Sequence, residues 1–290
     1  MEIAIDQTTI IIALVVIAAL VAGLIANRWV RPYAKTEVQG IKLETMIGPI
    51  VSITVLLLAF TLVTVYGGYQ RALAASQEES RKVDNLYEAA GFLKGSERIV
   101  IQSAMACYAT AVANYEWEAM AEGGVAPEVS PWSRQSEIGI KQAVQSDSDA
   151  SAILSALISA DRERGETRSK RLSESQPAVP DALKFFFLFC AGMALFALAA
   201  FTLPYVRRRV QIGVLVVLAT LFIMFMVLIK ELDEPYYGLA SIPPTDITRV
   251  AASLTEDYQE ENPDTPLPCD ETGREIPGAA ITEAAPAAKS

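Results

Sequence analysis

The sequence contains no histidine and only three cysteines among its 290 residues. Histidine is the commonest protein ligand for metals and the commonest general base near neutral pH. Its absence excludes a zinc enzyme, a histidine-based catalytic triad and a haem held by histidine. Cys107, Cys190 and Cys269 are scattered along the chain, so they predict neither a disulfide framework nor a metal site.

Charge is also missing from four long apolar runs. Each run has at least the roughly 20 residues that a helix needs to cross the hydrocarbon core of a bilayer, and a spanning segment must satisfy its own backbone hydrogen bonds. The sequence therefore predicts an all-α integral membrane protein with four transmembrane helices in two pairs. The first run lacks the basic leader of a signal peptide, so we expect it in the mature protein. The runs are residues 7–27, 45–70, 185–206 and 210–229.

The net charge of −10 belongs to the C-terminal part of the chain. Residues 231–290 hold 13 acidic and 3 basic residues, whereas residues 1–230 hold 21 of each. A neutral body with an acidic tail argues against nucleic-acid binding, which needs a basic face.

The segment between the two pairs predicts a helical soluble domain. Five apolar or aromatic residues recur there at steps of four and three, which is typical of one helix face: Ile101, Met105, Tyr108, Val112 and Tyr115. Proline, alanine and acidic residues dominate the end of the chain and predict disorder. The predicted parts are residues 1–70 (first pair), 71–180 (central domain), 181–230 (second pair), 231–252 (acidic segment with proline) and 253–290 (disordered tail).

Basic residues in the short loops favour one membrane orientation. Arg28, Arg31, Lys35 and Lys42 flank the first loop, and three arginines at 207–209 form the second. The positive-inside rule puts these loops in the cytoplasm, and the termini and central domain outside. The basic residues near the ends of the central domain are as numerous as those in the two short loops. The opposite orientation is therefore also compatible with the sequence.

The second span carries the candidate pore residues. Gly48 and Pro49 predict a kink near its start. The hydroxyls of Thr54, Thr61 and Thr64 predict a polar stripe that faces a pore, and Phe60 a hydrophobic constriction. The alternative is that the hydroxyls bond back to their own helix or join helices, and that Phe60 contacts lipid.

Two groups of acidic residues are candidates for chemical sites. Glu231, Asp233 and Glu234 follow the fourth span and have the oxygen ligands that calcium prefers; the alternative is a solvated acidic flank. Glu116 and Glu118 do not form a convincing acid–base pair, so we expect them to cap a helix or face solvent. No nucleophile–base pair or phosphate loop is present, so the sequence does not predict an enzyme.

Four stretches together resemble the bestrophin-like domain family, a bacterial group of four-helix membrane proteins distantly similar to bestrophin anion channels. The resemblance covers about residues 1–250. The stretches are residues 58–63 followed by Glu79; Tyr108 and residues 115–117; Arg168 with Arg171; and residues 232–238 followed by Ile242.

This resemblance implies a homo-oligomeric, all-helical channel whose second helix lines the pore. It points to Phe60 and the threonines on that helix, and to Asp233 and Glu234 as possible calcium ligands. Tyr236 and Tyr237 depart from the bestrophin pattern, and bestrophins keep their central region in the cytoplasm, opposite to the charge rule. The residues of the family motif are Glu116, Trp117, Arg168, Arg171, Asp233, Pro235 and Gly238.

Two functions follow as hypotheses. The first is a homo-oligomeric passive channel of the cell membrane that conducts small inorganic ions, in particular anions. The alternative is a non-conducting scaffold or sensor that binds a protein partner through the central domain and the acidic tail. The uncharged spans argue against an ion-coupled transporter, which places ionisable groups at membrane depth.

Overall fold

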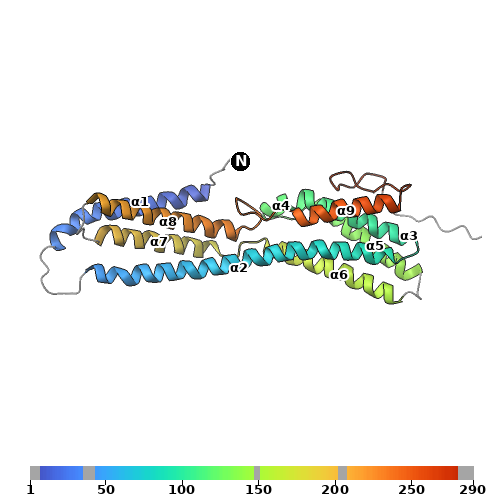
Figure 1. Cartoon of the computed structure of the whole chain (residues 1–290), viewed down its shortest axis with the longest axis horizontal. Coiled ribbons are helices and arrows are strands. Elements are labelled where there is room, and N and C mark those ends of the chain that lie inside the picture. The colour runs from blue at the N-terminus through green and yellow to red at the C-terminus, as the bar shows by residue number, and fades with distance from the viewer. Residues whose placement is uncertain (1–6, 35–42, 147–150, 202–207, 280–290) are drawn as a thin grey trace, which may run out of the picture. The chain divides into compact units, whose positions relative to one another are not determined.

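The computed structural model describes residues 7–34, 43–146, 151–201 and 208–279, and all the elements named in these residues are helices (Figure 1). An isolated β-bridge joins Cys269 and Glu275. The all-α prediction is therefore confirmed. The elements are α1 (Gln7–Ala34), α2 (Leu43–Gly91), α3 (Ser96–Ala111), the π-helix η1 (Val112–Glu116), α4 (Trp117–Ala121), the 3-10 helix η2 (Pro127–Val129), α5 (Ser130–Ser146), α6 (Ser151–Glu174), α7 (Asp181–Phe201), α8 (Arg208–Asp233) and α9 (Thr245–Glu261).

The chain divides into two compact units. We call Met1–Gly68 with Pro177–Asp233 the membrane unit, and Tyr69–Gln176 with Glu234–Ser290 the helical unit. The long helix α2 contributes to both. The segment after the fourth span thus belongs to the same unit as the central segment, instead of forming separate parts as the sequence suggested.

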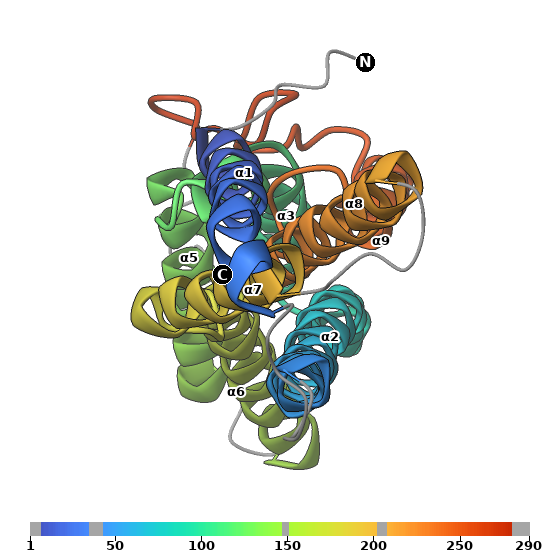
Figure 2. The same ribbon diagram turned by 90° about the vertical axis from the view of Figure 1, so that its left-hand side faces the viewer.

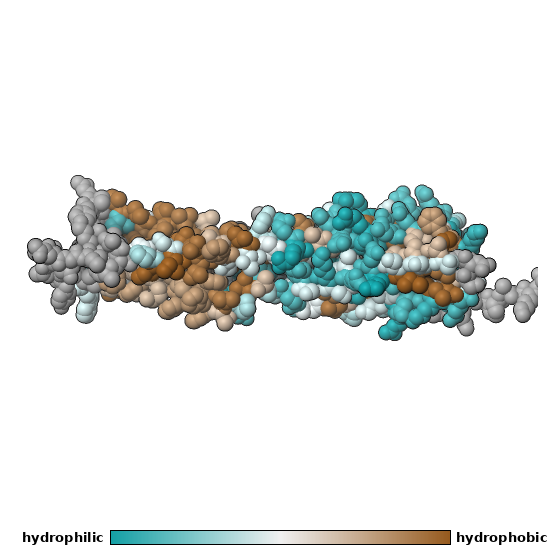
Figure 3. Space-filling model, turned by 90° about the horizontal axis from the view of Figure 1, so that it is seen from below, coloured by the Kyte–Doolittle hydropathy of each residue, from teal (hydrophilic) through white to brown (hydrophobic). Residues whose placement is uncertain are grey.

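The membrane unit contains the four predicted spans. Four helices in the described residues are long and apolar enough to cross a membrane: Gln7–Trp29, Ile47–Gly91, Asp181–Phe201 and Arg209–Asp233. The surface of this unit is mostly apolar, whereas that of the helical unit is largely polar (Figure 3). Helix α2 continues without a break to Gly91, well past the predicted end of the span at residue 70, because the alanine, glutamate and glutamine residues that follow favour helix.

Small residues let α1 and α7 approach closely. A Cβ atom on Gly23 would lie 2.6 Å from Ala199 Cβ and 2.7 Å from the carbonyl oxygen of Phe196. On the same face of α1, the Asn27 side chain donates a hydrogen bond of 2.8 Å to the carbonyl of Ala200. Helix α8 packs beside this pair, and α2 lies next to the group of three (Figure 2).

The core of the helical unit is built around α3. Helices α5 and α9 both pack against it, and the residues of the predicted stripe, apart from Tyr115, are fully buried. Tyr115 is partly buried and donates a hydrogen bond of 2.5 Å to the hydroxyl of Thr272. The stripe is therefore confirmed as a helix face, but the chain itself covers it.

The predicted disorder after residue 253 is wrong for residues 253–279. Helix α9 buries Ile247, Ala251, Leu254 and Tyr258, which recur at steps of four and three and give the helix one apolar face. The following loop returns to the unit, where Trp132 Nε1 donates a hydrogen bond of 2.8 Å to the carbonyl of Gly273. Residues 280–290 lie outside the described residues.

A disulfide joins Cys107 on α3 to Cys269 in this loop, with Cα atoms 5.8 Å apart and a sequence separation of 162 positions. The sequence predicts no disulfide framework, and the structure has this one bridge between two of the three cysteines. Sequence spacing gave no sign of the pairing, because only the folding of the loop onto α3 brings the two thiols together. Cys190, in α7, is free.

Candidate functional site

The predicted threonine stripe on α2 is divided between two faces. Thr54 and Thr61 are 4% and 7% exposed and face the interior of the membrane unit, whereas Thr64 is exposed. The hydroxyls of all three donate to the carbonyl four residues earlier, at 2.9 to 3.0 Å. This is the bonding pattern of threonine in an apolar helix. Of the three side chains, only that of Thr64 is exposed.

The opposite face of α2 exposes large apolar side chains. Ile53, Phe60 and Val63 are 59%, 64% and 70% exposed. They recur at steps of seven and three, so they lie on one side of the helix. Phe60 therefore projects away from its own chain.

Gly48 and Pro49 lie in the second turn of α2, and the helix runs through them without interruption. Both are exposed, and a Cβ atom on Gly48 would meet nothing within 4 Å. Pro49 is the seventh residue of α2, beyond the first four N–H groups that lack helical partners, so the helix loses one backbone hydrogen bond at this point.

Two of the acidic residues after the fourth span, Glu231 and Asp233, have basic or backbone partners. Asp233 is buried, accepts hydrogen bonds of 2.9 and 3.0 Å from the backbone N–H groups of Ala178 and Val179, and lies 2.7 Å from the ammonium of Lys184. Glu231 pairs with Lys230 at 3.8 Å. In the described part of the chain, no group of three or more acidic or cysteine residues is arranged to hold a metal ion. Asp233 instead fixes the beginning of α7, so its oxygens do not fit a role as calcium ligands.

A cluster of buried charges occupies the helical unit, and its centre is Arg171 on α6. Its guanidinium has no exposed surface and donates to Glu79 on α2 and to Glu116 at the end of η1. Burial alone lowers the pKa of a guanidinium, but the carboxylates of Glu79 and Glu116 outweigh burial and raise the pKa of Arg171 above its ordinary value. Arg171 therefore stays charged and links three elements of the unit.

Further arginines complete the cluster. Arg168 donates to Glu116 at 2.5 Å, and its guanidinium lies 5.9 Å from the centre of the Tyr108 ring. Arg164 lies 4.9 Å from the same ring and pairs with Asp161 at 2.8 Å. The cluster thus contains three positively charged arginines and three negatively charged carboxylates. Because each charge has an opposite partner, these side chains can be buried together.

Tyr108 is the fully buried neutral member of the cluster. Its hydroxyl donates a hydrogen bond of 2.6 Å to Glu79. Burial, and next the nearby carboxylate of Glu79, raise the pKa of Tyr108 well above its usual value of 10. Tyr108 therefore remains a hydrogen-bond donor throughout the physiological pH range.

The segment after the fourth span, residues 234–242, contacts this cluster through Trp117. Trp117 lies 5.1 Å from the Arg171 guanidinium, stacks edge-on against Tyr236 at 5.7 Å, and donates a hydrogen bond of 2.8 Å to the carbonyl of Ile242. The carbonyl of Pro235 accepts a hydrogen bond of 2.8 Å from the N–H of Ile242, and Gly238 has a φ of +82° in the turn between them. The family-motif residues other than Asp233 are thus gathered in one region of the helical unit.

Glu116 is the residue that the sequence placed wrongly. It is fully buried, whereas Glu118 is exposed as expected. Glu116 follows Val112 by four residues and so lies on the buried face of this helical stretch, but its charge favoured solvent. The residues that allow its burial, Arg168 and Arg171, come from α6. Glu79 was visible in the sequence only as part of the family resemblance.

Together, the apolar helices and the polar helical unit define an all-α integral membrane protein with four spans. The family model of the bestrophin-like domain matches residues 12–247, and the chain belongs to this family. No curated protein matches the sequence.

Solved structures show the same fold. A crystal structure of a membrane protein with a point mutation aligns with a TM-score of 0.64 at 12% identity, over 87% of this chain and 99% of that one. Two crystal structures of a bacterial bestrophin homologue from Klebsiella pneumoniae, each with a different point mutation, both give a TM-score of 0.60. The first is 12% identical in sequence and covers 84% of this chain, and the second is 13% identical and covers 88%. In both cases the alignment includes 98% of the homologue's chain.

Proposed function

We propose that the protein is a homo-oligomeric passive channel for small anions, and not an enzyme, with its pore formed between copies by the exposed face of α2. The observation that carries the proposal is the position of Phe60 and Val63, which project from the membrane unit without cover from their own chain. Membership of the bestrophin-like family supports it, and so does the lack of charged residues in the predicted spans.

The side chains on this face suit a passive pore. Large apolar side chains narrow a pore and gate it by dewetting, and no carboxylate on this face would repel an anion. Thr64 adds one exposed hydroxyl next to Val63. A passive pore needs no ionisable group at membrane depth, in contrast to a pump.

Currents in planar bilayers test this proposal. We expect Phe60→Ala to change the conductance or the anion preference of the purified protein, because the constriction loses its largest side chain. Leu14→Ala is the matched control, because Leu14 is 60% exposed on α1 and does not lie on α2. The absence of current from a folded wild-type oligomer in all ion conditions would overturn the proposal, as would equal effects of the two substitutions.

The alternative function, a scaffold that binds a protein partner, depended on a free apolar stripe on α3 and a free acidic tail. Neither is free in the described residues. The stripe of α3 is covered by α5 and α9 rather than free for a partner. The tail through residue 279 contacts its own helical unit, with Tyr115, Trp132 and Cys107 as anchors. No other described feature favours this alternative.

We further propose that the helical unit lies on the extracytoplasmic side of the membrane. The basic residues of the short loops favour this side. The disulfide between Cys107 and Cys269 supports the same side, because disulfides persist in oxidising compartments and are rare in the cytosol. This orientation is opposite to the one that the bestrophin resemblance implies.

Labelling with a membrane-impermeant maleimide tests the orientation. In a Cys190→Ala background, Gln259→Cys places a thiol on an exposed position of α9, and Gln39→Cys places one in the first short loop. In spheroplasts of a bacterial host, we expect Gln259→Cys to react at once and Gln39→Cys only after permeabilisation. The reverse pattern would overturn the orientation and leave the channel proposal untouched.

A further inference from the structure

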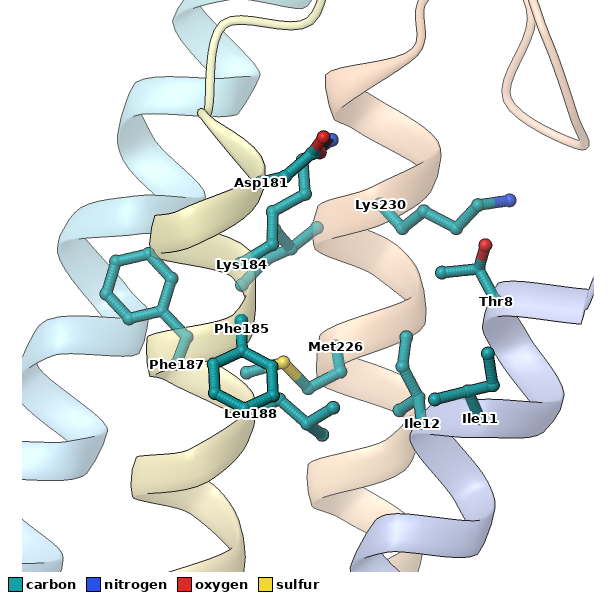
Figure 4. Close-up of a pocket in the computed structure, with 11 residues that line it drawn as sticks. Thr8, Ile11, Ile12, Asp181, Lys184, Phe185, Phe187, Leu188, Met226 and Lys230 are labelled. Atoms are coloured by element: carbon teal, nitrogen blue, oxygen red, sulfur yellow. Dashed lines mark ion pairs between the residues drawn. The ribbon is translucent and has the colours of Figure 1, made fainter.

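A cavity of about 210 Å³ lies within the membrane unit between the ends of three helices (Figure 4). Helices α1 and α7 begin there, and α8 ends there, so the cavity lies at one boundary of the membrane. Its walls are apolar, and four polar residues also line it: Thr8, Asp181, Lys184 and Lys230. In Figure 4 the polar ends of Thr8, Asp181 and Lys230 lie on one side of the view, and the apolar side chains lie on the other. The apolar lining residues are Ile11, Ile12, Phe185, Phe187, Leu188, Met226 and Ile229.

We propose that this cavity binds a zwitterionic phospholipid. An acyl chain would occupy the apolar part, the phosphodiester would contact Lys184 and Lys230, and the ammonium of the headgroup would contact Asp181. The ligand is therefore an ethanolamine-type glycerophospholipid of the surrounding membrane. The proposal does not depend on whether the protein conducts ions.

The apolar walls explain why the occupant is a lipid chain. The cavity is bordered by exposed apolar side chains, since Ile11 and Phe185 are 50% and 72% exposed. These face the hydrocarbon of the bilayer, which is the phase that supplies a chain. Because a lipid tail is already in apolar surroundings, the walls alone give little preference for one lipid. Selectivity must then come from the polar residues.

Those polar residues match a headgroup that carries both charges. Lys184 is held 2.7 Å from the buried carboxylate of Asp233, whose other contacts are backbone N–H groups, so its ammonium has a fixed position. Lys230 lies near Glu231 at 3.8 Å. The carboxylate of Asp181 is fully exposed. Three carboxylates, those of Asp181, Glu231 and Asp233, lie near the two lysines. The site therefore has no excess of positive charge that would favour an anionic headgroup, but it offers a partner for each charge of a zwitterion.

Native mass spectrometry of the delipidated full-length protein tests the proposal. The probes are phosphatidylethanolamine and phosphatidylglycerol with identical acyl chains. We expect one phosphatidylethanolamine to bind per chain, about threefold to fivefold more tightly than phosphatidylglycerol, the effect of one exposed ion pair. Asp181→Asn should remove this preference without disturbing the fold, because the side chain is fully exposed.

A matched pair of substitutions tests the cavity itself. Ile11→Trp should fill it and abolish the binding of both lipids, whereas Leu14→Trp, on the same helix but outside the cavity, should leave binding unchanged. Unchanged unfolding temperatures would show that both variants are folded. Equal or tighter binding of phosphatidylglycerol by the wild type, or lipid binding that survives Ile11→Trp, would overturn the proposal.

Discussion

At the scale of single residues, the charges around Arg171 matter most to the helical unit. A guanidinium without exposed surface loses its hydration, and this loss is offset only by well-placed carboxylates. Glu79 comes from α2 and Glu116 from η1, so the ion pairs of Arg171 hold distant parts of the chain in one arrangement. Tyr108 and Trp117 enclose the group with aromatic surface.

Replacement of Arg171 should destabilise the protein strongly. Arg171→Met leaves two buried carboxylates without their main partner, and we expect a loss of about 3–5 kcal/mol in the free energy of unfolding. Arg162→Met is the matched control on the same helix, because Arg162 forms an exposed pair with Glu166. It should have no measurable effect. Thermal unfolding of the purified protein in detergent measures both, and equal effects would contradict the role given to Arg171.

The raised pKa of Tyr108 predicts instability in alkali. A tyrosine whose folded pKa lies above its unfolded value of 10 contributes stability that is complete below pH 10 and is lost as the pH rises toward the folded pKa. Burial likewise raises the pKa of Tyr236. We therefore expect the unfolding temperature to fall above about pH 10. Tyr108→Phe should make this fall shallower, and an identical pH profile for the variant would contradict the assignment.

At the scale of elements, the contact between α1 and α7 depends on small residues. Alanine and glycine repeat every four residues along the first span, but two faces of α1 share this pattern, one with Ala18 and Ala22 and one with Ala19 and Gly23. The structure uses the face with Ala19 and Gly23, where a Cβ atom on Gly192 of α7 would lie 3.6 Å from Ala19 Cβ. Ala18 and Ala22 remain exposed.

A methyl group at Gly23 should therefore force the two helices apart. Gly23→Ala places a Cβ atom 2.7 Å from a backbone oxygen of α7 that cannot move away alone. We expect a loss of about 1–3 kcal/mol, typical of overpacking. Gly213→Ala on α8 is the control, because nothing lies within 4 Å of its Cβ position. Unfolding temperatures of the two variants should differ clearly, and a tolerated Gly23→Ala would show that the helices are not in close contact.

At the scale of the whole molecule, one disulfide joins the middle of the chain to its end. Cys107 and Cys269 close a long loop of the helical unit, and the residues around the bridge fasten the tail to α3, η1 and α5. Removal of a native disulfide typically costs about 2–5 kcal/mol. The bridge therefore contributes to the stability of the unit that holds the buried charges.

Thiol counting and a single substitution test this bridge. Denatured, unreduced protein should react with one maleimide per chain, at Cys190, and reduced protein with three. Cys269→Ala should lower the unfolding temperature, whereas Cys190→Ala should change it little. Three reactive thiols before reduction would show that the bridge does not form and would remove its support for the extracytoplasmic orientation.

The sequence by itself determined the four spans and the helical class, because the length and apolarity of a spanning segment are local properties. It also determined the buried face of α3, since helical periodicity needs no knowledge of the partner. The family resemblance named most residues of the charge cluster without showing that they meet.

Only the tertiary structure decided which side chains are brought together. Glu79, Glu116 and Arg171 lie far apart in sequence, and the burial of each charge depends on the other two. The threonines of α2 have one pattern in sequence but two environments in the fold. The tail reads as disordered by composition, yet an apolar face on α9 and a disulfide hold it. For the charge cluster, the threonines and the disulfide, the deciding contacts are between residues distant in sequence, which no local pattern encodes. The apolar face of α9 is the exception, because its period is local and was obscured by the composition of the tail.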